Sequence, residues 1–356
     1  MMGANDDIRS RAAEEGNAMR ALMIGGTGNI SLYVTRKLIR QGWDVTLLNR
    51  GSKNDLVPEA EVITCDARDE QAMKAALAGR SFDVVAQFIA YHPDDAARDV
   101  RLFTGRAGQY VFVSSASVYQ KPPRSPVITE STPASNPYWE YSRNKIACEQ
   151  LLMRAWDEQV FPVTIVRPSH TYGEGALPLS IHGKKGPWQV VRRVLDRKPV
   201  LLPGDGTSLW TVTWSDDFAD GFIGLMGNDH ALGETVHITG DEALTWNQIY
   251  RILSEALERP FLPCHVPSDL LALAKDYDYT GGLLGDKANC VVFDNSKVKR
   301  LVPGFTATTR FDQGVRMSLD YLLSHPEKQQ PDPDFDRFCD RAVDIMKRAE
   351  EGFAAL

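Results

Sequence analysis

The stretch ALMIGGTGNIS, residues 21–31, decides the fold of this chain. Four apolar residues that suit a buried strand lead directly into a glycine-rich turn and an amphipathic segment of helical period. Gly25 permits a tight turn, and Gly28 lets the backbone approach a pyrophosphate held at the helix N-terminus. Ser31, at the third position of the motif, is still small. The stretch predicts a dinucleotide-binding strand–turn–helix, although a structural turn without a ligand has the same pattern.

Short apolar runs alternate with longer amphipathic runs through residues 19–167. The first kind predicts strands and the second predicts helices, and their alternation builds a parallel sheet with helices on both faces. We predict an α/β fold: a Rossmann-type doubly wound parallel sheet over 19–167 and a smaller α/β substrate-binding lobe over 168–356, some segments of which return to the first domain. The predicted strands are 21–24, 44–48, 61–64, 83–89, 109–115 and 161–167, and helices are expected in the second lobe around 187–197, 215–226, 245–258, 310–324 and 334–350.

The composition is that of an ordinary globular protein, with 43% hydrophobic residues, 24% charged residues and a net charge of −7. This charge does not favour nucleic acid or an anionic membrane as a partner. The five cysteines are scattered, and the His, Cys and carboxylate residues lack metal-ligand spacing, so we expect neither a disulfide framework nor a metal. Residues 1–18 are polar and acidic and predict a disordered leader. Because no apolar run approaches the roughly 20 residues that span a bilayer, we expect a cytoplasmic protein.

The end of the second predicted strand, LLNRGSK (47–53), indicates which dinucleotide is bound. A carboxylate there binds the ribose 2′-OH of NAD, whereas an arginine can bind the 2′-phosphate of NADP. Asn49 takes the carboxylate position, Arg50 follows it and Lys53 is nearby. We therefore expect NADP as the preferred cofactor, or else NAD; Arg50 could also be a solvated loop residue. Asp66 could accept a hydrogen bond from the adenine amine or cap the following helix.

A second chemical motif follows the fifth predicted strand. That strand ends at Ser115, on the sheet edge where ligands bind, and YWEYSRNK (138–145) places Tyr141 and Lys145 on one face of a helix. A nearby ammonium group would lower the pKa of a phenol by roughly 1–3 units. Tyr141 could then remove a hydroxyl proton while a hydride leaves for a nicotinamide, with Ser115 holding the substrate oxygen. This spacing alone is typical of a helix surface; the dinucleotide turn upstream favours catalysis.

Together these motifs resemble the short-chain dehydrogenase/reductase superfamily, specifically its extended branch, the NAD-dependent epimerase/dehydratase family. The resemblance covers roughly residues 20–325 and includes GGTGNIS, CDARD, SSASVY, YSRNK, RPSHTYG and FDNSKVKR in family order. It implies Ser115, Tyr141 and Lys145 as catalytic residues. The cofactor-binding residues that we assign are Gly25, Gly28, Asn29, Ile30, Asn49, Arg50, Asp66, Ala90, Tyr141, Lys145, Pro168 and His170, and the substrate-binding residues are Ser115, Ser117, His92, His170 and Trp210. His92 could equally be a helix-entry histidine, and Trp210 a core residue.

Three departures from the family pattern concern the substrate and the dimer. Sugar-nucleotide enzymes of this branch have two arginines that bind the substrate pyrophosphate. Here Trp210 stands at one position and Leu283–Leu284 at the other. Lys184, Lys185 and Arg192 could compensate, or could be solvated surface charges. The segment Pro93–Gly105 predicts a helix shorter than the family's dimer helix, so a homodimer remains possible but without its usual helix.

The resemblance implies a sugar or sugar-nucleotide epimerase or dehydratase that works through a transient keto intermediate on a small carbohydrate. An NADP-dependent dehydrogenase or ketoreductase with a non-nucleotide hydroxyl substrate is the alternative, favoured by the missing arginines. A second alternative is RNA binding, because the chloroplast stem-loop binding proteins of this superfamily resemble residues 285–305. Those relatives lack the complete Tyr/Lys pair, and the acidic charge of this chain argues against nucleic acid.

Overall fold

A seven-stranded parallel sheet forms the centre of the first lobe in the computed structural model, which describes residues 18–356. The Rossmann-type fold predicted from the sequence is confirmed, and each of the six predicted strands is present within two residues of its expected bounds. The predicted leader falls almost entirely on residues 1–17, outside the described residues. The strands are β1 (Arg20–Ile24), β2 (Asp44–Asn49), β3 (Glu61–Thr64), β4 (Phe82–Gln87), β5 (Ala107–Val113), β7 (Val163–Pro168) and β11 (Thr235–Ile238), in the order β11-β7-β5-β4-β1-β2-β3.

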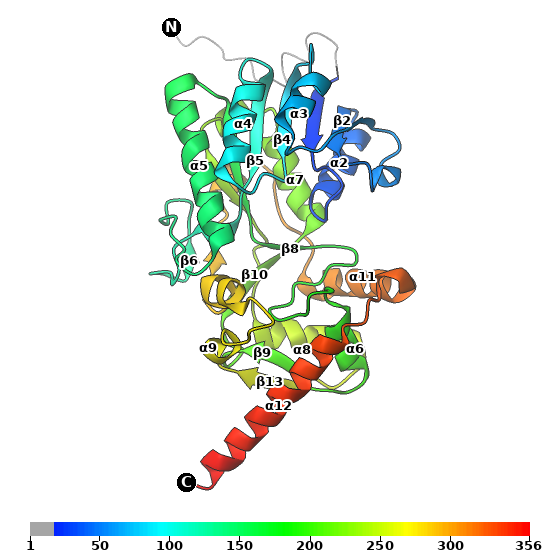
Figure 1. Cartoon of the computed structure of the whole chain (residues 1–356), viewed down its shortest axis with the longest axis vertical. Coiled ribbons are helices and arrows are strands. Elements are labelled where there is room, and N and C mark those ends of the chain that lie inside the picture. The colour runs from blue at the N-terminus through cyan, green and yellow to red at the C-terminus, as the bar shows by residue number, and fades with distance from the viewer. Residues whose placement is uncertain (1–17) are drawn as a thin grey trace.

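Helices cover both faces of this sheet because its strands are apolar on both sides (Figure 1). Along β1, Ala21 and Met23 belong to one buried cluster, whereas Leu22 and Ile24 belong to another, as the two-residue period of a strand requires. The first cluster includes apolar residues of α2 (Ser31–Arg40) and α7 (Ser215–Leu225), and the second includes those of α3 (Glu70–Ala76), α4 (Pro93–Phe103) and α5 (Glu140–Gln159). Helix α4 has 11 residues, the short length expected from the sequence.

The second lobe is built from small sheets and helices around a third cluster that contains Trp210, Trp246 and Leu283. Its three-stranded sheet has the order β12-β10-β8, and two further sheets pair β13 with β9 and β14 with β6. The strands are β6 (Val127–Ile128), β8 (His170–Tyr172), β9 (Val200–Pro203), β10 (Leu209–Trp214), β12 (Ala243–Thr245), β13 (Pro263–Val266) and β14 (Val292–Phe293). The helices are α6 (Trp188–Leu195), α8 (Trp246–Ala256), α9 (Ser268–Leu271), the π-helix η4 (Thr280–Lys287), α11 (Phe311–Ser324) and α12 (Pro333–Ala354).

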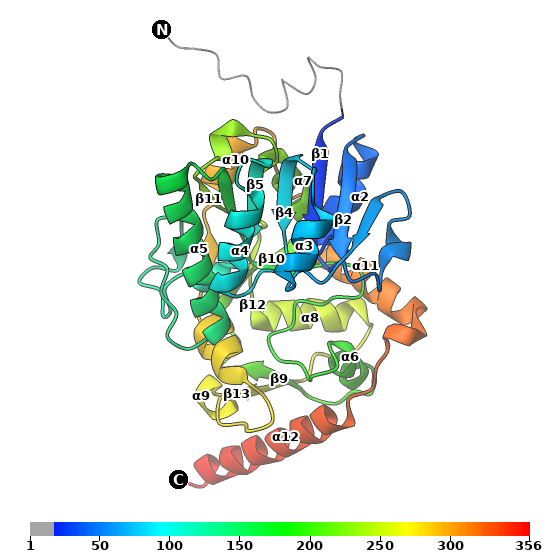
Figure 2. The ribbon, with the colours of Figure 1, turned by 45° about the horizontal axis from the view of Figure 1, so that its top comes forward.

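Three elements that follow residue 168 pack on the first lobe. Strand β11 is the edge strand beside β7, α7 contributes Phe218 and Phe222 to the cluster under α2, and α10 (Ser296–Leu301) contributes Val298 to the same cluster. The chain therefore crosses between the lobes more than once. Figure 2 shows α12 along the outer side of the second lobe, with α8 between it and the central sheet. Of the helices within residues 18–356, none is both long and apolar enough to span a bilayer.

The carboxyl ends of the central strands meet the second lobe, and this edge positions the candidate site. The glycine turn follows β1, Ser115 follows β5, and β7 leads through Ser169 into β8. Strand β8 pairs in parallel with β10, where His170 lies opposite Val212. Ligands of open α/β sheets bind in the crevice outside the carboxyl ends of the strands, which is this edge.

Candidate active site

A groove of about 460 Å³ runs along the carboxyl edge beside the glycine turn. Gly25 has φ +80°, in the left-handed region, and its N–H donates to the carbonyl of Leu48 at 3.0 Å. A Cβ at this glycine would lie 2.5 Å from Cγ2 of Ile89, so a larger residue would clash as well as strain the turn. The groove is lined by Gly25, Thr27, Gly28, Asn49, Arg50, Ser52, Lys53, Cys65, Asp66, Ala67, Arg68, Ile89, Tyr91, Asp95 and Arg98.

The turn is held closed by the small residue at the third motif position. The backbone N–H of Gly28 donates to Oγ of Ser31 at 2.8 Å, and the Ser31 hydroxyl donates to the carbonyl of Gly25 at 2.7 Å. Asn49 leaves its buried Nδ2 without a hydrogen-bond partner. A glycine turn, a helix N-terminus and an unpaired donor fit the pyrophosphate and ribose of a dinucleotide.

Four cations line the groove: Arg50 and Lys53 follow β2, Arg68 follows β3, and Arg98 lies on α4. The Arg68 guanidinium binds the Asp66 carboxylate, with Nη2–Oδ2 at 2.7 Å, and holds the pKa of that carboxyl well below its usual range. The sequence left open that Asp66 caps the next helix, and the structure shows that it does not. The cap of α3 is Asp69, whose Oδ1 accepts from the Ala72 N–H at 2.9 Å.

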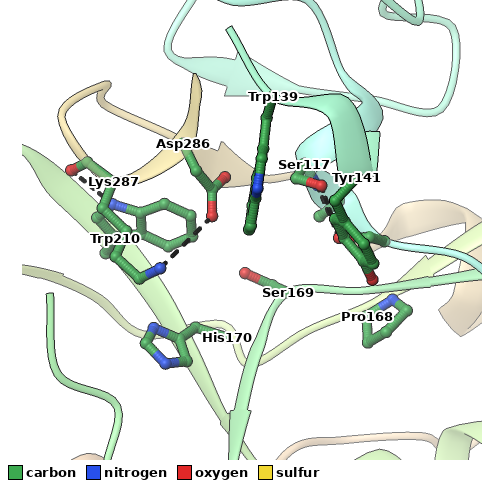
Figure 3. A pocket seen from close by; sticks show the side chains of 11 residues that line it. Ser117, Trp139, Tyr141, Pro168, Ser169, His170, Trp210, Asp286 and Lys287 are labelled. Atoms are coloured by element: carbon green, nitrogen blue, oxygen red, sulfur yellow. Dashed lines mark hydrogen bonds and ion pairs between the residues drawn. The ribbon is translucent and has the colours of Figure 1, made fainter. Parts of the chain in front are cut away.

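The reaction cavity, of about 250 Å³, contains the serine and the tyrosine predicted from the sequence (Figure 3). It meets the groove where Tyr141 of the cavity packs against Tyr91 of the groove, with 6.3 Å between the ring centres. The Oγ atoms of Ser115 and Ser117 are 2.9 Å apart, and Ser142 donates to Ser117 at 2.7 Å. This chain of hydroxyls fixes the loop after β5 against the first turn of α5. The lining residues are Ser115, Ala116, Ser117, Trp139, Tyr141, Pro168, Ser169, His170, Trp210, Asp286 and Lys287.

Lys145 is buried behind this cavity, with a residue exposure of 1%. Its ammonium donates to the carbonyls of Ala90 at 2.7 Å and Val113 at 2.8 Å, which fix it between the ends of β4 and β5. Its Nζ lies 5.9 Å from the ring centre of Tyr141. Burial lowers the pKa of Lys145 to about 8.

The pKa of Tyr141 differs from the sequence expectation. Burial raises the pKa of this phenol to about 12, and a hydrogen bond with Ser115 opposes the rise only in part. We expected Lys145 to lower this pKa below its ordinary value, and that expectation is wrong. The i,i+4 spacing correctly puts both residues on one helix, but desolvation outweighs the charge of an ammonium that two carbonyls already bind.

The opposite wall belongs to the second lobe. Asp286 and Lys287 end η4 and point into the cavity, and Trp139 and Trp210 flank them (Figure 3). The His170 ring packs edge to face on Trp210, with 6.3 Å between ring centres, and its buried Nδ1 has no hydrogen-bond partner. Burial lowers the pKa of His170 well below its ordinary value, which keeps the ring neutral at physiological pH.

The other predicted residues lie in different places. Pro168 and His170 line the reaction cavity, and Ala90 lies buried under Lys145 and contributes its carbonyl. Asn29 and Ile30 precede α2 and are absent from the set lining the groove. His92 precedes α4 and lines a more open groove with Tyr91 and Tyr138, while Lys184, Lys185 and Arg192 are absent from the set that lines the reaction cavity.

Five residues of the reaction cavity were missed from the sequence: Ala116, Trp139, Ser169, Asp286 and Lys287. The last two stand in GGLLGDKANC, shortly after Leu283 and Leu284, which occupy the position of the second arginine in the family pattern. Leu283 is fully buried, so the neighbouring Asp-Lys pair is the polar part of this segment that reaches the cavity. Within residues 18–356, no group of three or more His, Cys, Asp or Glu side chains is arranged to hold a metal ion.

Known proteins share both the sequence pattern and the fold. The chain is 29% identical to 2′-dehydrokanamycin reductase of Streptomyces kanamyceticus over 82% of its own length and 81% of the relative's. It is 26% identical to the chloroplast stem-loop binding protein of 41 kDa b of Arabidopsis thaliana, over 67% of this chain and 63% of that one. The structure of UDP-glucuronic acid 4-epimerase from Bacillus cereus superposes with a TM-score of 0.69 and 17% identity, covering 86% and 99% of the two chains.

A family model covers most of the chain. Residues 21–238 match that of the NAD-dependent epimerase/dehydratase family, and the match includes the glycine turn, Ser115, Tyr141 and Lys145. The resemblance inferred from the motifs is thereby confirmed. The chain belongs to the NAD-dependent epimerase/dehydratase family and is an NAD(P)-dependent enzyme of that family.

Proposed function

We propose that this protein transfers a hydride between NADP(H) and a secondary alcohol or ketone on a carbohydrate that carries no nucleotide. One observation carries the proposal: Ser115 and Tyr141 line one cavity, Lys145 is fixed directly behind it, and that cavity adjoins a groove fitted to a dinucleotide. Bound NADP(H) would supply a hydride donor or acceptor at C4 of its nicotinamide.

Each residue of the set has a distinct task. The Tyr141 hydroxyl gives its proton to the substrate oxygen in reduction, and accepts it in oxidation. Because the pKa of Tyr141 is about 12, the phenol is protonated at neutral pH and is ready to act as the acid. Ser115, which lines the same cavity as Tyr141, orients the substrate oxygen, and the Lys145 cation stabilises the phenolate that forms.

The preference for NADP is part of the proposal. Arg50 and Lys53 line the groove after β2 without a carboxylate at Asn49, whereas Arg68 is paired with Asp66. A 2′-phosphate would be attracted there, whereas the ribose diol of NAD would lack its usual acceptor. The Asn49 amide can still contact a ribose hydroxyl.

Reduction is favoured over epimerisation by the reaction cavity. Of the described residues that line it, none is an arginine, and its volume of about 250 Å³ suits one sugar ring. The relative from Streptomyces kanamyceticus is described as a reductase. Epimerisation or dehydration through a transient ketone is the second candidate, because the family includes such enzymes and the same three residues could serve them.

RNA binding has weaker support. It depends on the similarity to the Arabidopsis protein, which covers 67% of this chain. The catalytic tyrosine and lysine are both present, and burial of Lys145 would serve no purpose in RNA binding. If RNA binding were the function, RNA affinity would be salt-sensitive and would survive Tyr141→Phe.

The test is a screen of neutral sugars, their keto derivatives and nucleotide sugars with NADP(H) and NAD(H), with and without Tyr141→Phe. Stoichiometric oxidation or reduction of NADP(H) that Tyr141→Phe abolishes supports the proposed reductase. Turnover that regenerates its cofactor identifies an epimerase or a dehydratase instead. Turnover that is unchanged in Tyr141→Phe would remove the proposed chemistry.

A further inference from the structure

A charged pair forms the wall of the reaction cavity opposite Tyr141 (Figure 3). Asp286 and Lys287 point into the cavity, and Lys121, whose side chain is 1% exposed, lies beside Asp286. One carboxylate oxygen lies 3.7 Å from the Lys121 Nζ, and the other lies 3.9 Å from the Lys287 Nζ. Both distances exceed the 2.7–3.2 Å of an N–H···O hydrogen bond. The three groups are therefore close enough to attract one another but leave hydrogen-bonding positions that a ligand can fill.

This wall is fixed in place from behind. The indole N–H groups of Trp210 and Trp246 donate to the carbonyl of Lys287 at 3.0 and 2.8 Å. Asn136 donates to the carbonyl of Gly285 at 2.7 Å and to that of Ser117 at 2.8 Å, which ties η4 to the serine loop. Short π-helical segments often occur at functional sites, and here one ends with the two charged residues at the cavity.

We infer that Asp286 and Lys287 bind two neighbouring hydroxyl groups of an uncharged ring of monosaccharide size, which is the substrate of the proposed function. A hydroxyl group can donate to the carboxylate, and its neighbour can accept from the ammonium. Trp139 and Trp210 supply flat apolar faces for the C–H side of such a ring. The inference rests on the proposed function and adds the chemical class of its substrate.

The same wall disfavours charged substrates. If the ring is bound as inferred, a carboxylate in place of the hydroxyl beside Asp286, or an ammonium group in place of the hydroxyl beside Lys287, meets a like charge in a site of low dielectric constant. A nucleoside diphosphate would also need room beyond a cavity of about 250 Å³, and cations that make bidentate bonds to phosphate.

The experiment measures substrate affinity in the full chain loaded with NADP⁺, by quenching of tryptophan fluorescence, because Trp139 and Trp210 line the cavity. The neutral probes are the methyl glycosides of glucose, galactose and mannose. The tightest of these is compared with its uronate, its 2-amino analogue and UDP-glucose. We expect the neutral glycoside to bind about tenfold more tightly than each of the three, the effect of one charge-assisted hydrogen bond.

Two variants then test the pair itself. Asp286→Asn and Lys287→Met should each weaken binding of the neutral glycoside about tenfold. The two variants should shift the preference between the uronate and the amino analogue in opposite directions. Asp286→Asn should favour the uronate relative to wild type, and Lys287→Met should favour the amino analogue. An unchanged NADP⁺ affinity shows that both variants are folded, and Lys347→Met, an exposed lysine on α12, is the matched control.

The outcomes separate this inference from the proposed function. Tighter binding of UDP-glucose, no saturable binding of any neutral glycoside, or a shift in the same direction for both variants would overturn the inference. Tyr141-dependent turnover of UDP-glucose would also overturn it, while leaving hydride transfer intact. Failure to bind NADP(H), or turnover that is unchanged in Tyr141→Phe, would contradict the proposed function and the inference together.

Discussion

The cofactor groove and the reaction cavity lie at the same edge of one sheet but are assembled differently. Every residue lining the groove falls between Gly25 and Arg98, and its shape depends largely on backbone turns. The reaction cavity draws on short segments spread from Ser115 to Lys287, contributed by both lobes. A local motif can therefore predict the groove, whereas the substrate side depends on how distant segments pack.

The largest expected effect comes from removing Lys145, which lies between the groove and the reaction cavity. Lys145→Met should lower turnover by about 1,000-fold, because the phenolate of Tyr141 loses its nearby cation. NADPH affinity, measured by fluorescence titration, should fall much less. The control is Lys74→Met, an exposed lysine on α3. Turnover within tenfold of wild type would contradict the role of Lys145.

The same lysine predicts a pH dependence of stability. Its pKa is about 8 in the folded protein and about 10.4 in an unfolded chain, so between these values the unfolded state binds more protons. The free energy of unfolding should therefore rise with pH across this window, by up to about 3 kcal/mol more in wild type than in Lys145→Met. Urea denaturation of both proteins at pH 7.5 and pH 10 measures the difference. Equal changes in the free energy of unfolding of wild type and Lys145→Met between the two pH values would show that Lys145 is not desolvated.

On the groove side, Arg50→Asp should raise the Kd of NADPH about 30-fold and that of NADH much less, since only NADPH places a phosphate beside this residue. Isothermal titration calorimetry with both cofactors measures the two effects. Arg300→Asp makes the same charge change at an exposed position of α10 and should affect neither cofactor. Equal weakening of NADPH and NADH would reject the 2′-phosphate assignment.

On the cavity side, two neighbouring glycines of η4 form a matched pair. A Cβ at Gly281 would lie 2.2 Å from Cδ1 of Trp139, whereas one at Gly282 would have no atom within 4 Å. Gly281→Ala should displace Trp139, raise KM severalfold with little change in kcat, and lower the free energy of unfolding by about 1–2 kcal/mol. Steady-state kinetics and denaturation measure both effects. Identical behaviour of Gly282→Ala would contradict the packing role of Gly281.

The sequence was sufficient for six of the seven strands of the sheet, the glycine turn and the proximity of Ser115, Tyr141 and Lys145, because these depend mainly on local periodicity or short spacing. The catalytic roles of the three residues stay predictions. The sequence could not supply Asp286 and Lys287, since TGGLLGDK has no helical period and its three glycines suggest a loop. The sequence could not predict the pKa of Tyr141 either, because the burial of this side chain arises from tertiary packing. Nor could spacing alone show that Arg68 binds Asp66.

The most direct test of the account is the single-turnover rate of hydride transfer in wild type and Tyr141→Phe, each loaded with NADPH and mixed rapidly with the ketone that the screen identifies. Absorbance of the reduced nicotinamide follows the step itself. We predict that Tyr141→Phe binds NADPH with nearly wild-type affinity but transfers the hydride at least about 100-fold more slowly. An equal rate in the two proteins would contradict the assignment of Tyr141 as the proton donor.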